Sequence, residues 1–278
     1  MLAFGIRRRV PFSFMDSPRF KLTRMDAVRY LLALPPGSVD LIVTDPAYES
    51  LEKHRARGTT TRLKQSTASS NPWFPIFPNE RFREFFDACW QALRPNAHLY
   101  VYCDDETAYL LKPIGEQVGF HYWKRIVWDK MKIGLGYHYR SRVEYILFFE
   151  KGKRRLNDLA MPDAFDFKED PDGYALECTR IARGYPTEKP VMCSERLICQ
   201  SSDPGELVVD PFMGSGSVGE AALRNRRRFA GCDILDEAVQ RATHRLATVA
   251  AELDLLNTND ICDVESQGTA ALPLHPAP

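Results

Sequence analysis

The sequence predicts an α/β protein built on a mostly parallel sheet with helices on both faces. Segments with the pattern of strands alternate with segments of helical spacing along most of the chain. The run Asp40-Leu-Ile-Val-Thr44 is short, apolar and bounded by turn residues, which is typical of a buried parallel strand. A glycine-rich turn follows another such run, which ends at Val209.

Seven strands are expected in a Rossmann-like sheet. They are predicted at residues 20–23, 40–44, 99–103, 125–128, 143–149, 206–209 and 229–232. The helices are predicted at 27–34, 82–93, 106–118, 190–200, just after the glycine turn and at 236–253. Pro35-Pro36-Gly37 ends the first helix, while Pro190 suits the first turn of a later one.

The chain is expected to form one large domain at 19–256, because 278 residues are too few for several. An N-terminal extension at 1–18 precedes it, and a Pro- and Ala-rich tail at 257–278 is expected to be flexible. Residues 49–79 read as a long loop, and loops of that length are usually functional. Residues 151–183 are charged and weakly patterned, as in a small inserted region.

The composition is that of an ordinary globular protein, with 44% hydrophobic and 27% charged residues. No apolar run reaches the roughly 18 residues of a membrane span. The seven cysteines include no Cys-x-x-Cys pair, so reduced thiols in a cytoplasmic protein are expected and a metal site is not.

The net charge is zero, but the charges are unevenly distributed. The loop at 49–79 carries a basic stretch without acids, made of Lys53, Arg55, Arg57, Arg62 and Lys64. A basic face can bind nucleic-acid phosphates whatever the total charge of the protein. A solvated surface loop is the alternative interpretation of such a charge run.

The glycine turn after Val209 contains Gly214, Gly216 and Gly219 in the spacing G-x-G-x-x-G. With Asp233 about 20 residues on, this pattern alone suggests a dinucleotide oxidoreductase. Asp210, however, stands just before the glycines, where its carboxylate would repel a pyrophosphate and attract a cation. S-adenosylmethionine carries a sulfonium and an ammonium group, and its ribose diol could bind Asp233. A tight strand-to-helix turn without a ligand is the structural alternative.

Asp45-Pro46-Ala47-Tyr48 follows the strand at 40–44. An exocyclic amino group of adenine or cytosine is a poor nucleophile, because its lone pair is delocalised into the ring. The Asp45 carboxylate and the Pro46 carbonyl could accept its hydrogens, and Tyr48 could stack on a base that has left the duplex. An ordinary strand-to-loop turn with a buried tyrosine is the alternative.

Together these stretches resemble the amino-group DNA methyltransferases, which methylate adenine N6 or cytosine N4, in their permuted beta group. The matching segments also include Met25-Asp26-Ala27, Trp128-Asp-Lys130, Glu144–Gly152 and Tyr185-Pro-Thr-Glu-Lys189-Pro190. The resemblance covers about residues 20–245 and implies a methyltransferase sheet, S-adenosylmethionine as cofactor and double-stranded DNA as substrate. It makes a homodimer and a cognate restriction endonuclease plausible partners.

The resemblance also implies roles for individual residues. Asp45, Pro46 and Tyr48 would be catalytic, and 151–183 would help to recognise the target. The cofactor would be held by Asp210, Phe212, Gly214, Ser215, Gly216 and Asp233. Thr187 and Lys189 would lie near its methionine carboxylate, and Asp26 would contact its adenine ring. For Asp26, a helix N-cap is an equally good interpretation.

Two departures from the family pattern stand out. Ala47 replaces a second proline of the tetrad, and only about 151–183 is available for target recognition. Either recognition is then shared with the 49–79 loop, or specificity is low. Asp45 favours adenine N6 as the target, because cytosine-N4 enzymes more often carry serine there. Cytosine N4 remains the alternative, ahead of an NAD-binding oxidoreductase and of a DNA-binding protein with an inactive methyltransferase fold. The absence of a Pro-Cys dipeptide argues against cytosine-C5 chemistry.

If the permuted order holds, the strands at 40–44 and 206–209 are neighbours at the topological switch point of the sheet. Their carboxyl ends would then face one crevice, where such sheets bind ligands.

Overall fold

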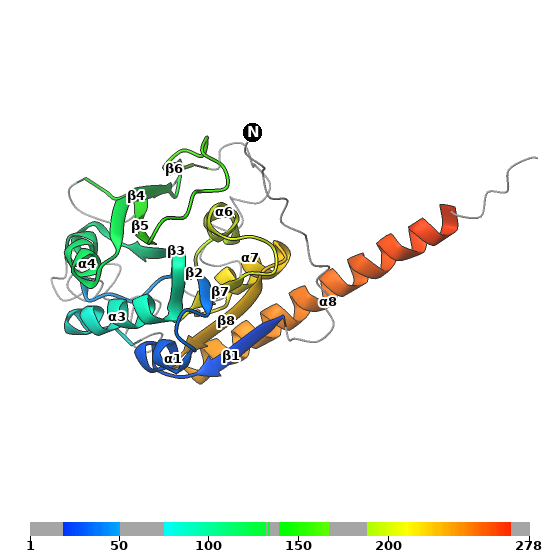
Figure 1. The fold of residues 1–278 in the computed structure, drawn as a ribbon, viewed down its shortest axis with the longest axis horizontal. Helices are drawn as coiled ribbons and strands as arrows, with labels where there is room; N and C mark the ends of the chain where they lie inside the picture. The colour runs from blue at the N-terminus through cyan, green and yellow to red at the C-terminus, as the bar shows by residue number, and fades with distance from the viewer. Residues whose placement is uncertain (1–18, 51–74, 132, 134–138, 167–187, 268–278) are drawn as a thin grey trace, which may run out of the picture.

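The computed structural model describes residues 19–50, 75–131, 133, 139–166 and 188–267, with the backbone alone over 257–267. A sheet of eight strands runs through the centre of the molecule, with helices on both faces (Figure 1). The strands are β1 (Phe20–Arg24), β2 (Val39–Thr44), β3 (Leu93–Cys103), β4 (His121–Asp129), β5 (Val143–Lys151), β6 (Ala164–Phe165), β7 (Leu207–Asp210) and β8 (Arg228–Asp233). The helices are α1 (Ala27–Ala33), the 3-10 turn η2 (Asn79–Arg81), α3 (Phe82–Ala92), α4 (Asp105–Val118), α6 (Val191–Ser201), α7 (Ser217–Arg224) and α8 (Asp236–Gln267).

The strand order is β1-β8-β7-β2-β3-β5-β4-β6. Strand β5 is antiparallel to both of its neighbours, and the remaining pairs are parallel. Strands β2 and β7 pair directly, with Leu41 opposite Val208. This confirms the expected contact between two strands that lie far apart in the sequence.

The sheet has eight strands where seven were expected. The eighth is β6, a two-residue strand that pairs with β4 inside the region assigned to target recognition. Strand β3 also begins at Leu93, well before the predicted start at Leu99. Its register to β2 is irregular between Val39 and Leu41, and that irregularity accommodates Pro95, which cannot donate a ladder hydrogen bond.

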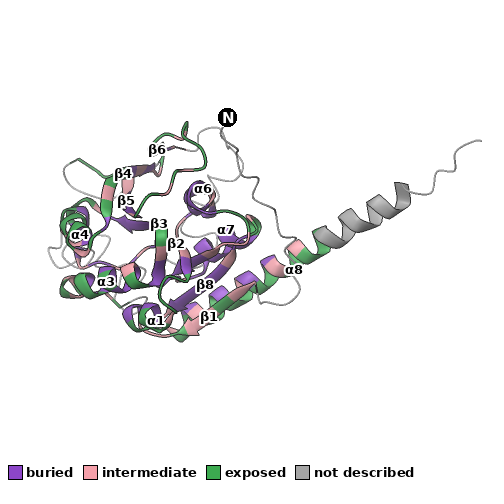
Figure 2. Ribbon diagram, viewed as in Figure 1, coloured by how far each residue is buried: buried purple, intermediate pink, exposed green. Residues whose placement is uncertain are grey.

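Alternating side chains of the strands form two hydrophobic layers, one on each face of the sheet. The central strands are accordingly among the most buried parts of the ribbon (Figure 2). On β2, Ile42 belongs to the layer that α1, α3 and α4 cover. Leu41 and Val43 belong to the layer that α6, α7 and α8 cover. Both faces of the central strands are therefore buried, which explains why their sequences are continuously apolar, as expected for a parallel sheet between two helical layers.

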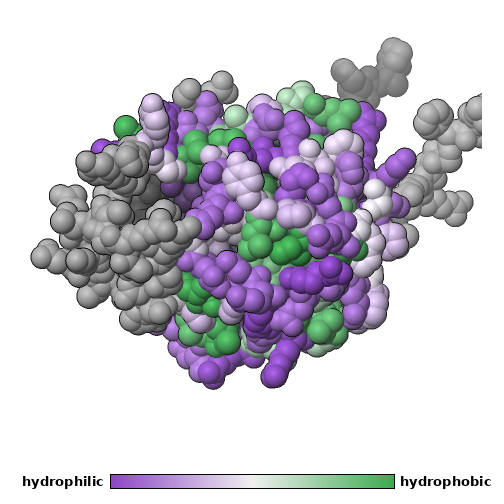
Figure 3. Space-filling view, turned by 90° about the vertical axis from the view of Figure 1, so that its left-hand side faces the viewer, coloured by the Kyte–Doolittle hydropathy of each residue, from purple (hydrophilic) through white to green (hydrophobic). Residues whose placement is uncertain are grey.

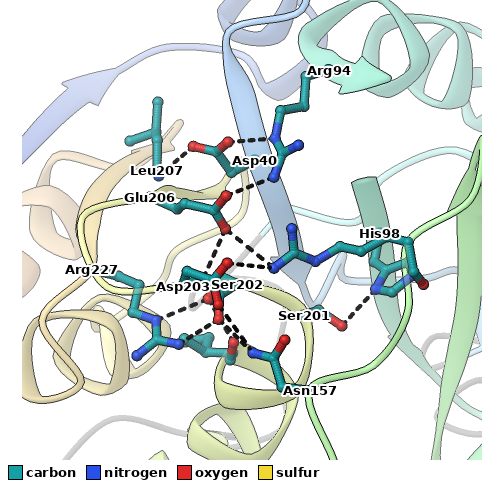
Figure 4. A network of polar contacts seen from close by, with 12 residues as sticks. Asp40, Arg94, His98, Asn157, Ser201, Ser202, Asp203, Glu206, Leu207 and Arg227 are labelled. Atoms are coloured by element: carbon teal, nitrogen blue, oxygen red, sulfur yellow. Dashed lines mark hydrogen bonds and ion pairs between the residues drawn. The ribbon is translucent and has the colours of Figure 1, made fainter. Parts of the chain in front are cut away.

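A polar network locks the amino ends of the central strands (Figure 4). The Arg94 guanidinium contacts Asp40 of β2 at 2.5 Å and Glu206, just before β7, at 2.6 Å. The second oxygen of Asp40 accepts the backbone N–H of Leu207 at 2.7 Å. Buried His98 on β3 reaches the hydroxyl of Ser201 on α6 at 2.7 Å. These contacts fix β2, β3 and β7 at the end opposite to the predicted site.

Helix α8 continues to Gln267, into the segment expected to be a flexible tail, and projects from the body of the molecule (Figure 1). Its sequence contains neither proline nor glycine, so nothing in it interrupts the helix.

The side on which α3 and α4 lie shows hydrophobic patches separated by hydrophilic residues (Figure 3). Within the described ranges, no helix is long and apolar enough to span a membrane.

Candidate active site at the carboxyl ends of the central strands

Three carboxylates lie at the carboxyl ends of three parallel strands that are neighbours in the sheet. Asp45 follows β2, Asp210 ends β7 and Asp233 ends β8. The order β8-β7-β2 brings these ends to one edge of the sheet, at the topological switch point. The charges of Asp45 and Asp233 both act on Asp210, which favours a cationic ligand at this edge.

Asp210 is the most deeply buried of the three, with 2% of its surface exposed. Its Oδ1 accepts the Thr44 hydroxyl at 2.7 Å and the Phe212 backbone N–H at 3.0 Å. Burial raises the pKa of Asp210 to about 7, with smaller contributions from the charges of Asp45 and Asp233, although both hydrogen bonds oppose the shift. Ionised Asp210 is thus costly in this buried position, and a positive charge beside it would offset that cost.

Asp233 closes the glycine turn onto the end of β8. Its two carboxylate oxygens accept the backbone N–H groups of Gly214 at 3.1 Å and Leu235 at 2.9 Å. Burial raises the pKa of Asp233, while these backbone donors act in the opposite direction. Each oxygen has a further lone pair that can accept from a ligand, so the residue fits the ribose diol of S-adenosylmethionine.

The glycines of the turn serve two different purposes. Gly216 caps α7 with φ +84°, and a Cβ there would lie 3.0 Å from the Ala242 Cβ of α8. Gly219 lies inside α7, where a Cβ would come within 2.8 Å of Leu246 and Phe229. The close packing of α7 against α8 and β8 therefore explains Gly219 without a ligand.

Ser215 joins the turn to the segment that precedes α6. Its hydroxyl donates to Glu188 Oε2 at 2.7 Å, and Arg245 of α8 contacts Glu188 Oε1 at 2.9 Å. Neither Glu188 nor Arg245 was predicted from the sequence, although Glu188 stands between the predicted Thr187 and Lys189. Thr187 itself lies outside the described residues.

Phe212 contributes an aromatic face at the same edge. Its ring centroid lies 5.1 Å from that of Phe77 and 5.6 Å from that of Phe85. Phe77 also holds the tetrad in place, because its backbone N–H donates a hydrogen bond to the Ala47 carbonyl at 2.6 Å. Tyr48, which is buried, pairs with Phe77 as an isolated bridge. The two ends of the predicted loop at 49–79 are thus joined beside the site.

The Asp45 carboxylate lies 2.7 Å from Lys189 Nζ. Burial raises the pKa of Asp45, and the Lys189 ammonium opposes this shift. Lys189 was expected near the methionine end of the cofactor, and in the structure its ammonium contacts the first residue of the tetrad, Asp45. Glu144 of β5 contacts the same ammonium at 3.2 Å and lies 3.2 Å from Lys130. Glu144 and Lys130 belong to segments that matched the family, but no role was assigned to either of them.

Asp26 is the N-cap of α1, with its Oδ1 accepting the Arg29 N–H at 3.2 Å. Its carboxylate also pairs with the Arg81 guanidinium, which holds the pKa of Asp26 below its ordinary value. The capping interpretation is therefore confirmed, and contact with the cofactor's adenine stays a prediction.

The basic residues predicted to bind DNA, namely Lys53, Arg55, Arg57, Arg62 and Lys64, lie outside the described ranges. No metal-type cluster of three acidic, His or Cys side chains occurs among the residues described.

Comparison with known proteins identifies the class to which this fold and site belong. Residues 39–244 match the model of the N6/N4 DNA methylase family. The chain belongs to this family of amino-methyltransferases, as the motifs indicated, with S-adenosylmethionine as the cofactor of the class.

Several curated proteins are similar along most of their length. The putative methylase YubD of Escherichia coli (strain K12) is 29% identical over 237 residues, which are 84% of this chain and 93% of that protein. The type II methyltransferase M.HpaI of Haemophilus parainfluenzae is 26% identical over 243 residues, or 81% of this chain and 74% of that protein.

Among solved structures, TTHA0409 of Thermus thermophilus, a putative DNA modification methylase complexed with S-adenosyl-L-methionine, has a TM-score of 0.56. It is 20% identical, and the match covers 83% of this chain and 94% of that one. The PvuII DNA methyltransferase, which is cytosine-N4-specific, also has a TM-score of 0.56, at 17% identity over 82% of this chain and 88% of that one. These similarities confirm the α/β methyltransferase fold.

Proposed function

We propose that the protein transfers a methyl group from S-adenosylmethionine to the exocyclic N6 of adenine in double-stranded DNA. The observation that carries this proposal is the meeting of three carboxylates at one edge of the sheet: Asp210 and Asp233, at the ends of β7 and β8, suit a positively charged methyl donor, and Asp45, after β2, suits the target amino group. Asp45 is the acceptor for the target amino group, and Asp210, Phe212 and Asp233 line the cofactor side. When bound, S-adenosylmethionine supplies an activated methyl group.

In the transfer, the lone pair of the target nitrogen forms the new N–C bond. The donor held by Asp210, Phe212 and Asp233 would supply the methyl group, with its sulfur as the leaving group that keeps the C–S electron pair. Nitrogen then loses one proton, which passes through the Asp45 carboxylate to solvent. The Asp45 oxygens and the Pro46 carbonyl hold the amino hydrogens, so catalysis rests mainly on positioning and on the charge of Asp45.

Adenine is favoured over cytosine because the tetrad begins with aspartate at position 45. The fold similarity to a cytosine-N4 enzyme makes cytosine N4 the second candidate. The test is to methylate a random-sequence duplex, digest it to nucleosides and separate the products by mass spectrometry. N6-methyldeoxyadenosine is expected as the product, whereas N4-methyldeoxycytidine would establish the second candidate. A homodimer and a companion restriction endonuclease stay predictions from the sequence.

We expect the basic stretch of the 49–79 loop to contact DNA phosphates. Changing Arg55 and Arg57 together to glutamine should weaken binding to all duplexes alike, because phosphate contacts carry little sequence information. The log–log salt dependence of the binding constant should flatten by about 0.9 for each phosphate contact that is removed, as counterion release predicts. Fluorescence anisotropy at several salt concentrations measures both effects. An unchanged slope, or a changed base preference, would argue against backbone contact.

A further inference from the structure

Four charged side chains form a chain of alternating sign across the catalytic edge of the sheet. Lys130, after β4, contacts Glu144 of β5, which contacts Lys189, which contacts Asp45 after β2. The successive N···O distances are 3.2, 3.2 and 2.7 Å. The two cations balance the two anions, so the chain is neutral as a whole.

The order of the strands in the sheet explains how these residues meet. Strands β2, β3 and β5 are consecutive in the sheet, so Asp45 and Glu144 lie on either side of β3. Lys189 comes from the segment before α6 and bridges the gap, with its Nζ 5.6 Å from the ring centroid of Tyr102 on β3. Only 11% of the Lys189 side chain is exposed, so its charge is poorly screened by water.

Lys189 presents a difficulty for the transfer that Asp45 is proposed to carry out. The Asp45 carboxylate has to attract the hydrogens of a nitrogen that becomes positive as it attacks the methyl group. An ammonium bound to Asp45 alone would compete with that nitrogen and weaken the carboxylate as an acceptor. Glu144 contacts the same ammonium and so shares its charge with Asp45.

We propose that Glu144 is a positioning residue for methyl transfer, which acts on the Asp45 carboxylate through Lys189. Glu144 holds the ammonium between the two acids, and Lys130 in turn holds Glu144. The arrangement orients Asp45 without fully neutralising it. This inference rests on the proposed function for its effect on rate, whereas the coupling between Glu144 and Asp45 can be measured without any methylation.

The charges around these groups support the coupling. Burial raises the pKa of Asp45, and the negative charge of Glu144 adds to this shift while Lys189 opposes it. Burial acts against ionised Glu144, but Lys189 and Lys130 hold the pKa of Glu144 below its ordinary value. Among the described residues, Asp210 on β7 also interacts electrostatically with Asp45. Tyr48, Tyr102 and Cys103 also face Asp45, and burial raises the pKa of each, so these three stay neutral in the assay range.

The test measures the Asp45 pKa directly by carbon NMR on protein labelled at the aspartate carboxyl carbon, with Asp45→Asn identifying the signal. Glu144→Gln removes the charge and keeps the shape, so the pKa of Asp45 should fall. Lys189→Met removes the opposing charge, so the pKa of Asp45 should rise. Glu150→Gln is the matched control, because Glu150 is a buried acid at the other end of β5. It should leave the pKa of Asp45 unchanged even if it lowers stability.

The rate provides the second measurement. In Glu144→Gln, kcat should fall by roughly 10- to 100-fold, as expected for one lost hydrogen bond to a charged group, with an unchanged Kd for S-adenosylmethionine. In the pH dependence of kcat, the acidic limb should move to lower pH, because the pKa of Asp45 falls. An Asp45 pKa that is the same in wild type and Glu144→Gln would overturn the inference, and so would a rate loss without movement of the limb. If the variants show the expected changes in the Asp45 pKa but wild-type protein does not methylate DNA, the result contradicts the proposed function instead.

Discussion

Asp45→Ala should reduce methyl transfer by roughly 10²- to 10⁴-fold, the usual contribution of a positioned group that handles a proton. The carboxylate is the only acid assigned to the target amino group, and its removal leaves Glu144 as the acid that contacts Lys189 within the described residues. The rate is best measured in a single turnover, with enzyme in excess over DNA, so that product release does not mask the chemical step.

The cofactor affinity of Asp45→Ala should stay close to that of wild type, because the cofactor is assigned to the turn between β7 and β8. Asp87→Ala, which removes an exposed acid from α3, is the control and should turn over normally. Full turnover by Asp45→Ala would remove Asp45 from the mechanism. A parallel loss of cofactor binding would show that the two halves of the site are not separate.

Asp233→Ala should weaken S-adenosylmethionine binding by roughly 1.5–3 kcal/mol for each hydrogen bond lost to the charged group. The structure adds a second reason for a large effect. Asp233 also accepts the backbone N–H groups of Gly214 and Leu235, so the turn proposed to receive the cofactor would lose its anchor on β8. Isothermal titration calorimetry measures the affinity.

Asp236→Ala is the matched control for Asp233, since Asp236 is an exposed acid three residues on that pairs with Arg24. Its cofactor affinity should equal that of wild type. If Asp233→Ala and Asp236→Ala both bind the cofactor like wild type, the ribose lies elsewhere. The Asp45 assignment would survive that result, because the two aspartates follow different strands.

The sequence predicted the parts of the site that are local in the chain. Asp45 and Asp210 each follow a short apolar strand, and turn residues next to them mark where the strand ends. The contact of β2 with β7 followed from the permuted order of the motifs, and the structure confirms it. The N-cap interpretation of Asp26 was available from its place before an apolar helix.

The parts that depend on contacts between distant segments could not be read from the sequence. Lys189 contacts Asp45 and Glu144 only because α6 packs against β2 and β3 while β5 pairs with β3, and no local pattern encodes that meeting. Glu188 reaches Ser215 for the same kind of reason. Strand β6 escaped detection because two residues carry no periodicity. The extension of α8 was missed because Pro and Ala at the end of the chain suggested an earlier stop.

The most direct test of the proposed activity is the transfer of label from S-adenosylmethionine, labelled in its methyl group, to purified random-sequence duplex DNA. Wild-type protein and Asp45→Ala are compared at equal concentration, and the label that stays with the DNA is counted. We predict labelled DNA with wild type and only background with Asp45→Ala. Background with wild type, or equal labelling by both proteins, would contradict methyl transfer at the carboxyl ends of β2, β7 and β8.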